Sequence, residues 1–207
     1  TAEIAERIET FWRPYHAKLA EAIAATHRRH GVAVIFDGHT IRSRVARFFT
    51  GQLSDLNLGT AKGASVAPDL GARVFDILEG SDYSAVRDER FTGGYITRTY
   101  GRPADGVNVL QLELTWRTYM DEGPPFAYLP DRAARLKTVL RAMVEDPGAP
   151  NNAFAAIEIF PDHSVAIRGN FRQDSYENLS KKSVTTISTS KTAEIKMPPP
   201  RLELGLT

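Results

Sequence analysis

A histidine and a glutamate are the residues best placed for chemistry. His39 follows the apolar run 32–36 and the Asp37-Gly38 pair, and Glu113 stands between two leucines. An imidazole beyond a buried strand can reach the crevice at the carboxyl ends of a parallel sheet. A carboxylate in an apolar strand is costly unless it is paired or used in a reaction. The alternatives stay open: His39 as a loop cap, and Glu113 as an edge-strand carboxylate facing water.

Arginines follow these two residues closely. Arg42, Arg44 and Arg47 come soon after His39, and Arg98 lies in the glycine-flanked segment 93–101. Guanidinium groups bind carboxylates through two parallel hydrogen bonds, so these side chains are candidates for anion recognition. A solvated surface charge is the alternative for each of them. The two adjacent glycines of the segment predict a close backbone approach or unusual dihedral angles.

Short motifs of other enzyme classes are missing. The chain has 5 histidines and 0 cysteines, with no H-E-x-x-H, dinucleotide-binding, P-loop or G-x-S-x-G pattern. Catalytic zinc usually needs about three protein ligands, and no second histidine stands at an obvious ligand spacing from His39.

Hydrophobic periodicity predicts the elements that position these residues. Helical spacing runs over 2–29, with a kink or division at Pro14 and a stop at Gly31. Strands are predicted at 32–36 and 107–114, helices at 68–78 and 130–145, and a long loop at 42–65. Residues 1–149 are predicted to form an α/β domain. Residues 150–207 are predicted to be an extension, with a hairpin at 154–171 and a poorly ordered or surface tail from about 180.

Composition and charge exclude several classes of protein. The 207 residues are 42% hydrophobic and 25% charged, which excludes wholesale disorder, collagen and coiled coil. Lys+Arg is 26 against 25 for Asp+Glu, so bulk charge argues against a nucleic-acid partner. No apolar run approaches the roughly 18–20 residues that span a bilayer, which argues against a membrane partner. The lack of cysteine fits a cytoplasmic location.

Six segments in order resemble the N-formylglutamate amidohydrolase (N-formylglutamate deformylase) family over about residues 1–146. They include D-G-H-T-I-R-S, R-F-T-G-G-Y-I-T-R and Q-L-E-L. The segments are 12–16, 37–43, 48–60, 90–98, 111–114 and 119–122.

The resemblance implies a zinc amidohydrolase. The implied fold is an α/β three-layer sandwich with a mostly parallel sheet, of the zinc-carboxypeptidase-like (phosphorylase/hydrolase-like) type. The implied reaction is hydrolysis of N-formyl-L-glutamate to formate and glutamate, in histidine degradation. His39 matches a zinc ligand and Glu113 the general base. Positions that match the binding of the N-acyl amino acid substrate are Arg42, Ser43, Asn57 and Arg98.

The sequence departs from the family pattern in ways that favour an incomplete site. The family's upstream zinc-binding segments are not present, so the fold is expected to lack its N-terminal strands. Thr40 and Thr99 replace the usual Ser and His. An inactive fragment or non-catalytic relative is therefore the alternative, as is a module that binds carboxylates through arginines. An open sheet edge would favour a homo-oligomer, aggregation, or a tail strand from 154–171 over that edge.

Overall fold

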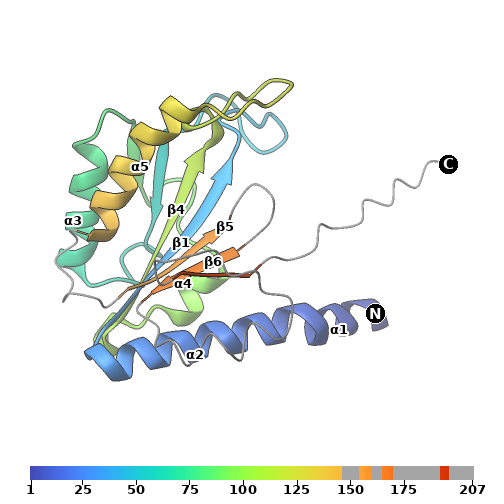
Figure 1. Ribbon diagram of the computed structural model, residues 1–207, viewed down its shortest axis with the longest axis vertical. Coiled ribbons are helices and arrows are strands. Elements are labelled where there is room, and N and C mark those ends of the chain that lie inside the picture. The colour runs from blue at the N-terminus through green and yellow to red at the C-terminus, as the bar shows by residue number, and fades with distance from the viewer. Residues whose placement is uncertain (146–153, 160–164, 170–191, 196–207) are drawn as a thin grey trace.

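The protein forms one seven-stranded sheet with helices on both faces (Figure 1). The computed structural model describes residues 1–145, 154–159, 165–169 and 192–195. The strand order is β3-β2-β4-β1-β5-β6-β7.

The two longest strands lie at the centre and carry the residues singled out above. β1 (Ala33–Ile41) pairs in parallel with β4 (Val107–Thr115) along its whole length. β1 is therefore longer than the predicted strand 32–36, and His39 lies within the strand, not beyond it. The apolar run ends at Phe36, but pairing with β4 continues to the Ile41–Thr115 pair, so the polar residues stay in the sheet.

A short strand replaces part of the loop predicted at 42–65. β2 (Leu56–Gly59) is fully buried, pairs antiparallel with β4, and pairs in parallel with β3 (Ala85–Arg87). The chain leaves β1 and re-enters the sheet at the same end, so β2 must run in the opposite direction to β4. The described strands make three parallel and three antiparallel pairings, so the sheet is mixed and the mostly parallel prediction was wrong.

Three strands from the C-terminal extension complete the sheet on the other side of β1. β5 (Phe154–Ile159) pairs in parallel with β1, and β6 (Val165–Gly169) pairs antiparallel with β5, which is the pairing expected of the predicted hairpin. β7 (Thr192–Ile195) pairs antiparallel with β6, inside the tail predicted to be poorly ordered. The hairpin turn and the rest of that tail lie outside the described residues. β1 thus has neighbours on both sides, and the lack of N-terminal strands stays a prediction.

The N-terminal helix is continuous but changes its winding ahead of Pro14. α1 (Ala2–Arg7) passes through a π-helical turn (Ile8–Trp12) into α2 (Arg13–His30), where Pro14 occupies the first turn. A π-helical turn can accommodate a proline that supplies no backbone N–H. The kink or division expected at Pro14 is therefore a local change of winding in a continuous helix. α2 ends at Gly31, whose φ of 73° is the left-handed conformation of a helix C-cap.

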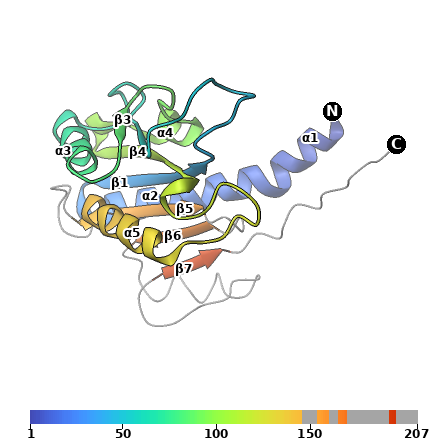
Figure 2. The same ribbon diagram turned by 90° about the horizontal axis from the view of Figure 1, so that it is seen from above.

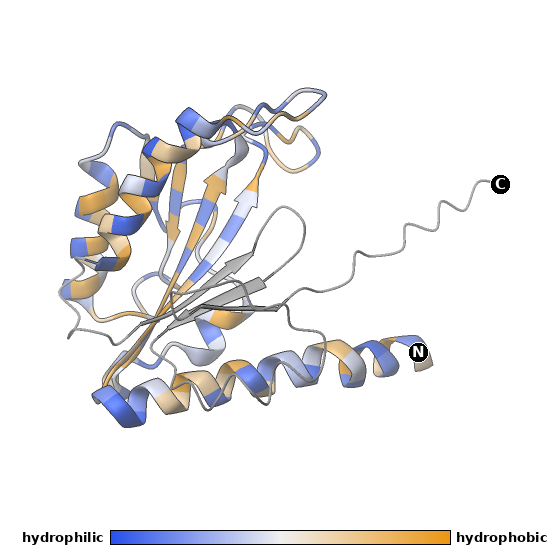
Figure 3. Cartoon of the chain, in the orientation of Figure 1, coloured by the Kyte–Doolittle hydropathy of each residue, from blue (hydrophilic) through white to orange (hydrophobic). Residues whose placement is uncertain are grey.

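Helices cover the two faces of the sheet with separate apolar clusters. α3 (Pro68–Glu79) and α5 (Pro130–Glu145), both predicted from periodicity, lie side by side on one face (Figure 2). Their apolar residues alternate with polar ones along each helix (Figure 3). α2 and the short α4 (Tyr95–Tyr100) cover the other face, where Leu19 and Ile23 pack on Ile35 and Val109. No helix in the described ranges is long and apolar enough to cross a membrane.

Candidate active site

Polar side chains share the sheet face that α2 covers, toward the carboxyl ends of β1 and β4. Alternate residues of a strand point to the same face. Asp37 and His39 therefore continue the row of Ile35 on β1, and Gln111 and Glu113 continue the row of Val109 on β4. His39 is the direct register partner of Glu113, so the two predicted chemical groups are neighbours on adjacent strands.

His39 is held by a buried carboxylate on its own strand. Its Nε2 lies 3.1 Å from Oδ1 of Asp37, whose side chain is 2% exposed, whereas the imidazole is 36% exposed. The interaction with Asp37 raises the pKa of His39 above its ordinary value. Burial opposes this effect, and the Glu113 charge also raises the pKa. Among the described residues, no aligned hydrogen-bond donor reaches Asp37 Oδ1, so its contact with the imidazole rests on the 3.1 Å distance.

Glu113 is a buried carboxyl group with an altered proton affinity. The residue is 7% exposed. Burial raises the pKa of Glu113 to about 7; the Asp37 charge adds to this effect and the His39 charge opposes it. A carboxyl group of this kind exchanges protons near neutral pH, as general bases do.

Asn57 adds a side chain from a third strand, β2, to the cluster. It lies opposite Glu113 in the antiparallel register of β2 and β4 and is 3% exposed. Its Nδ2 donates to the backbone oxygens of Ser54 (2.8 Å) and Glu113 (3.2 Å). The amide nitrogen thus fixes the local backbone, and the described residues give the side-chain oxygen no donor. Asn57 lies in the predicted site, but half of its side chain has a structural task.

Arg98 lies on α4, which is fastened to the same face. Gln111 Oε1 accepts the Gly94 N–H at the start of α4 (2.7 Å). Arg98 is exposed, and its guanidinium donates to the Gly93 oxygen (2.5 Å). The loop ahead of α4 meets the predicted glycine requirement, because Gly93 has a φ of 109°. Within the described part of the chain, Arg98 forms no hydrogen bond or ion pair with His39 or Glu113.

Arg42 and Ser43 are bound to a different part of the molecule. Arg42 donates to the Glu122 backbone oxygen (2.5 Å) and lies over the rings of Trp116 and Phe126. The Ser43 amide and hydroxyl both donate to the Glu122 carboxylate (2.5 Å each). Among the described residues, neither side chain forms a hydrogen bond or ion pair with His39 or Glu113. The structure therefore brings together His39, Glu113 and Asn57, and it leaves the predicted Arg42, Ser43 and Arg98 outside that cluster.

Aromatic residues beside the cluster were not predicted as part of a site. Burial and the Asp37 charge raise the pKa of Tyr15 to about 12, which keeps its phenol protonated. His16 Nδ1 lies 2.8 Å from the Tyr100 hydroxyl. In the sequence, Tyr15 lies in the apolar stripe of the helix, where an aromatic ring is ordinarily core, and within the family-like segment 12–16.

The described residues fit a zinc ion only in part. The buried Asp37 Oδ1 has no hydrogen-bond partner in the described part of the chain and lies beside the imidazole of His39. A carboxylate oxygen and an imidazole nitrogen are both donors that zinc takes. Yet the described residues contain no group of three or more His, Cys, Asp or Glu able to hold a metal. A catalytic zinc site needs about three protein ligands, so this part of the chain does not complete one.

The fold and the site define an α/β protein with an acid–base cluster at the carboxyl ends of its central parallel strands. Comparison with known proteins agrees. The family profile of N-formylglutamate amidohydrolase matches residues 1–120, so the chain belongs to that family.

Individual relatives point the same way. The chain is 46% identical to an N-formylglutamate deformylase of Pseudomonas aeruginosa over 135 residues, which are 65% of this chain and 51% of the relative. It is 42% identical to an N-formylglutamate deformylase of Pseudomonas putida over 67% of this chain and 52% of the relative. The crystal structure of an N-formylglutamate amidohydrolase from Ralstonia eutropha JMP134 superposes with a TM-score of 0.62 at 27% identity, covering 70% of this chain and 53% of that one. The chain thus spans about half the length of the curated relatives it matches.

Proposed function

We propose that this chain carries the acid–base part of an amidohydrolase site that cleaves the formyl amide of N-formyl-L-glutamate. The observation that carries the proposal is the register pairing of His39 with Glu113 on one face of the sheet. The names of the relatives support the substrate.

The chain's own residues have separable roles in this reaction. Glu113 accepts a proton from the attacking water, whose oxygen forms a bond to the formyl carbon. The carboxyl group then returns the proton to the amine nitrogen as the C–N bond breaks, which releases formate and glutamate. Asp37, at 3.1 Å from Nε2, holds the imidazole of His39 in one orientation beside that carboxyl group. Arg98 is proposed to bind a carboxylate of the substrate. It lies on α4, whose first residues are bound to this face of the sheet by the hydrogen bond from the Gly94 N–H to Gln111.

Zinc dependence is a further part of the proposal, with His39 as one ligand. It requires donors beyond those described, and no step above depends on it. The role in histidine degradation and the cytoplasmic location are proposals of the same kind. The alternatives are a non-catalytic relative and a carboxylate-binding module, which would bind the substrate without cleaving it.

Formate release by the purified chain, with and without added zinc, tests the proposal. Glu113→Gln removes the base but keeps the shape of the side chain, so turnover should fall about 100-fold or more while substrate binding persists. Glu79→Gln, an exposed carboxylate at the end of α3, is the matched control and should leave turnover unchanged. Binding of N-formyl-L-glutamate without any formate release would instead support the carboxylate-binding module. The absence of both binding and release would support the non-catalytic relative.

A further inference from the structure

A polar cavity lies on the opposite face of the sheet from the His39–Glu113 pair. Its volume is ≈ 680 Å³, within the range of sites that hold small organic molecules. The lining comes from the end of α3, the segments that precede β2 and β3, the turn after β4, and α5. Val139 and Tyr83, which line it, pack against the apolar cluster of α3 and α5. The cavity is therefore separated from the candidate active site by the sheet itself.

Three guanidinium groups and two carboxylates line this cavity. Arg117 and Asp55 neutralise each other, with Arg117 Nε 2.8 Å from Asp55 Oδ1. Asp55 also accepts from the backbone N–H (3.1 Å) and the hydroxyl (2.7 Å) of Ser84, so its oxygens are occupied. The charges that remain are Arg132 and Arg135 against Asp82.

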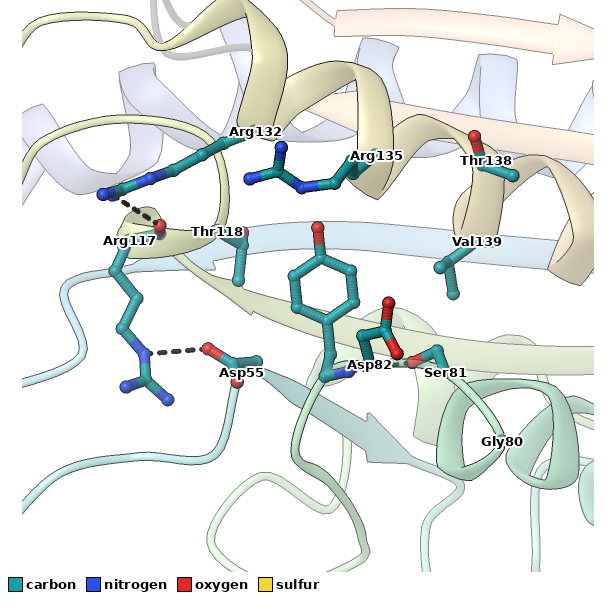
Figure 4. A pocket seen from close by; sticks show the side chains of 11 residues that line it. Asp55, Gly80, Ser81, Asp82, Arg117, Thr118, Arg132, Arg135, Thr138 and Val139 are labelled. Atoms are coloured by element: carbon teal, nitrogen blue, oxygen red, sulfur yellow. Dashed lines mark hydrogen bonds and ion pairs between the residues drawn. The ribbon is translucent and has the colours of Figure 1, made fainter.

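Arg132 and Arg135 have guanidinium N–H donors that form no hydrogen bond within the described part of the chain. They lie one turn apart on α5 and enter the same space, as Figure 4 shows, with the Arg117–Asp55 pair nearby. Arg132 gives one bond, to the Arg117 backbone oxygen (3.3 Å), and neither arginine has a carboxylate partner among the described residues. Each guanidinium carries five N–H donors. Arg132 also lies in the first turn of α5, at its positive N-terminal end, where a cation is unfavourable and an anion would be stabilised.

We propose that this cavity binds a small organic oxyanion whose carboxylate or phosphate group lies between Arg132 and Arg135. Two guanidinium groups on one side match the several oxygens of such a group. Tyr83 adds a phenol to the lining. Asp82 on the other wall would repel a second anionic group, so a ligand with one charged end and a neutral, hydroxylated body fits best (Figure 4).

Calorimetric titration of the full chain at low ionic strength tests the proposal, with inorganic phosphate and acetate as separate probes. One saturable site is expected for at least one probe, and the tighter probe identifies phosphate or carboxylate as the group recognised. Arg135→Gln and Arg132→Gln should each weaken binding about tenfold or more, because each removes a charge-assisted hydrogen bond. Arg141→Gln, an exposed arginine of the same helix outside the lining, should change the affinity less than about twofold.

Two results would overturn the proposal. One is the absence of saturable binding for both probes, and the other is equal weakening by Arg141→Gln, which would mean attraction to the helix charge in general. Circular dichroism of each variant excludes loss of fold as the cause, and Tyr83→Phe, which keeps the packed ring, should also weaken binding. Glu113→Gln should leave anion binding within about twofold of the parent, so the outcome is independent of the proposed hydrolysis.

Discussion

At the scale of single residues, the environment of each histidine decides its chemistry. His39 lies beside a carboxylate and has a raised pKa, whereas His16 lies among the rings of Trp12, Tyr95 and Tyr100. Burial lowers the pKa of His16 below its ordinary value. Two imidazoles on the same face of the sheet are thus biased toward opposite protonation states.

His16 should make the folded protein less stable in mild acid. The unfolded chain binds the His16 proton near pH 6.5, whereas the folded chain binds it only at lower pH. The stabilisation by neutral His16 is therefore fully present above pH 6.5 and is lost as the pH falls toward the folded-state pKa. Urea unfolding at pH 7.5 and pH 5.5 should show a smaller loss of stability for His16→Gln than for the parent. Equal losses would contradict the prediction.

At the scale of elements, β2 is positioned by contact between two backbones. A Cβ at Gly59 would lie 2.6 Å from the Gly93 nitrogen and 2.8 Å from the Thr92 carbonyl carbon, and backbone atoms cannot move aside cheaply. β2 carries Asn57 into the site, so this close approach also fixes one wall of the cluster.

Gly59→Ala should therefore be strongly destabilising. We expect a loss of roughly 1–3 kcal/mol in the free energy of unfolding, the usual cost of overpacking a close-packed region. Gly123→Ala is the control, because a Cβ there meets nothing within 4 Å. Denaturant unfolding of both variants measures the difference, and similar stabilities would show that the segment at 91–94 can yield.

The N-terminal helix divides into a part that packs and a part that does not. α1 and the π-helical turn bury no residue, and Phe11 is 57% exposed, whereas Leu19 of α2 is fully buried. Phe11→Ala should change the free energy of unfolding by less than about 0.5 kcal/mol. Leu19→Ala should cost about 2–5 kcal/mol. Thermal or urea unfolding of the two variants measures these changes. A large effect of Phe11→Ala would mean that the apolar residues of α1 and the π-helical turn are covered in solution.

Periodicity was sufficient for the long elements and insufficient for the short ones. α3 and α5 were predicted nearly to their ends because apolar residues recur along one face. β2 was missed because four residues give too little alternation to stand out from a polar loop. The extension of β1 was missed because three polar residues look like a strand end unless the pairing partner is known. His39 and Glu113 were identifiable from residue type and family resemblance, but Asp37, although it lies in the family-like segment 37–43, had no assigned role until the strand placed it beside the imidazole.

At the scale of the whole molecule, the C-terminal strands protect the centre of the sheet. β5 supplies the second neighbour of β1, and β6 and β7 extend the sheet beyond it. Removing residues 150–207 should leave the backbone groups of β1 unpaired along one edge, which promotes pairing with other chains. Size-exclusion chromatography with light scattering should then detect oligomers or aggregates. A chain ending at Ile195 keeps all seven strands and is the control. Monomeric behaviour of the shorter chain would contradict the prediction.

Ser43 and Glu122 link two segments that lie far apart in the sequence. The backbone N–H and the hydroxyl of Ser43 both donate to the Glu122 carboxylate, so neither is available to bind a second carboxylate. An anion could bind these two donors of Ser43 only by displacing the Glu122 carboxylate. The turn that contains Glu122 would then lose its hydrogen bonds to the segment after β1. Ser43 and Arg42 therefore bind the same turn, so breaking the Ser43–Glu122 bonds would also weaken the contact of Arg42 with the Glu122 backbone oxygen.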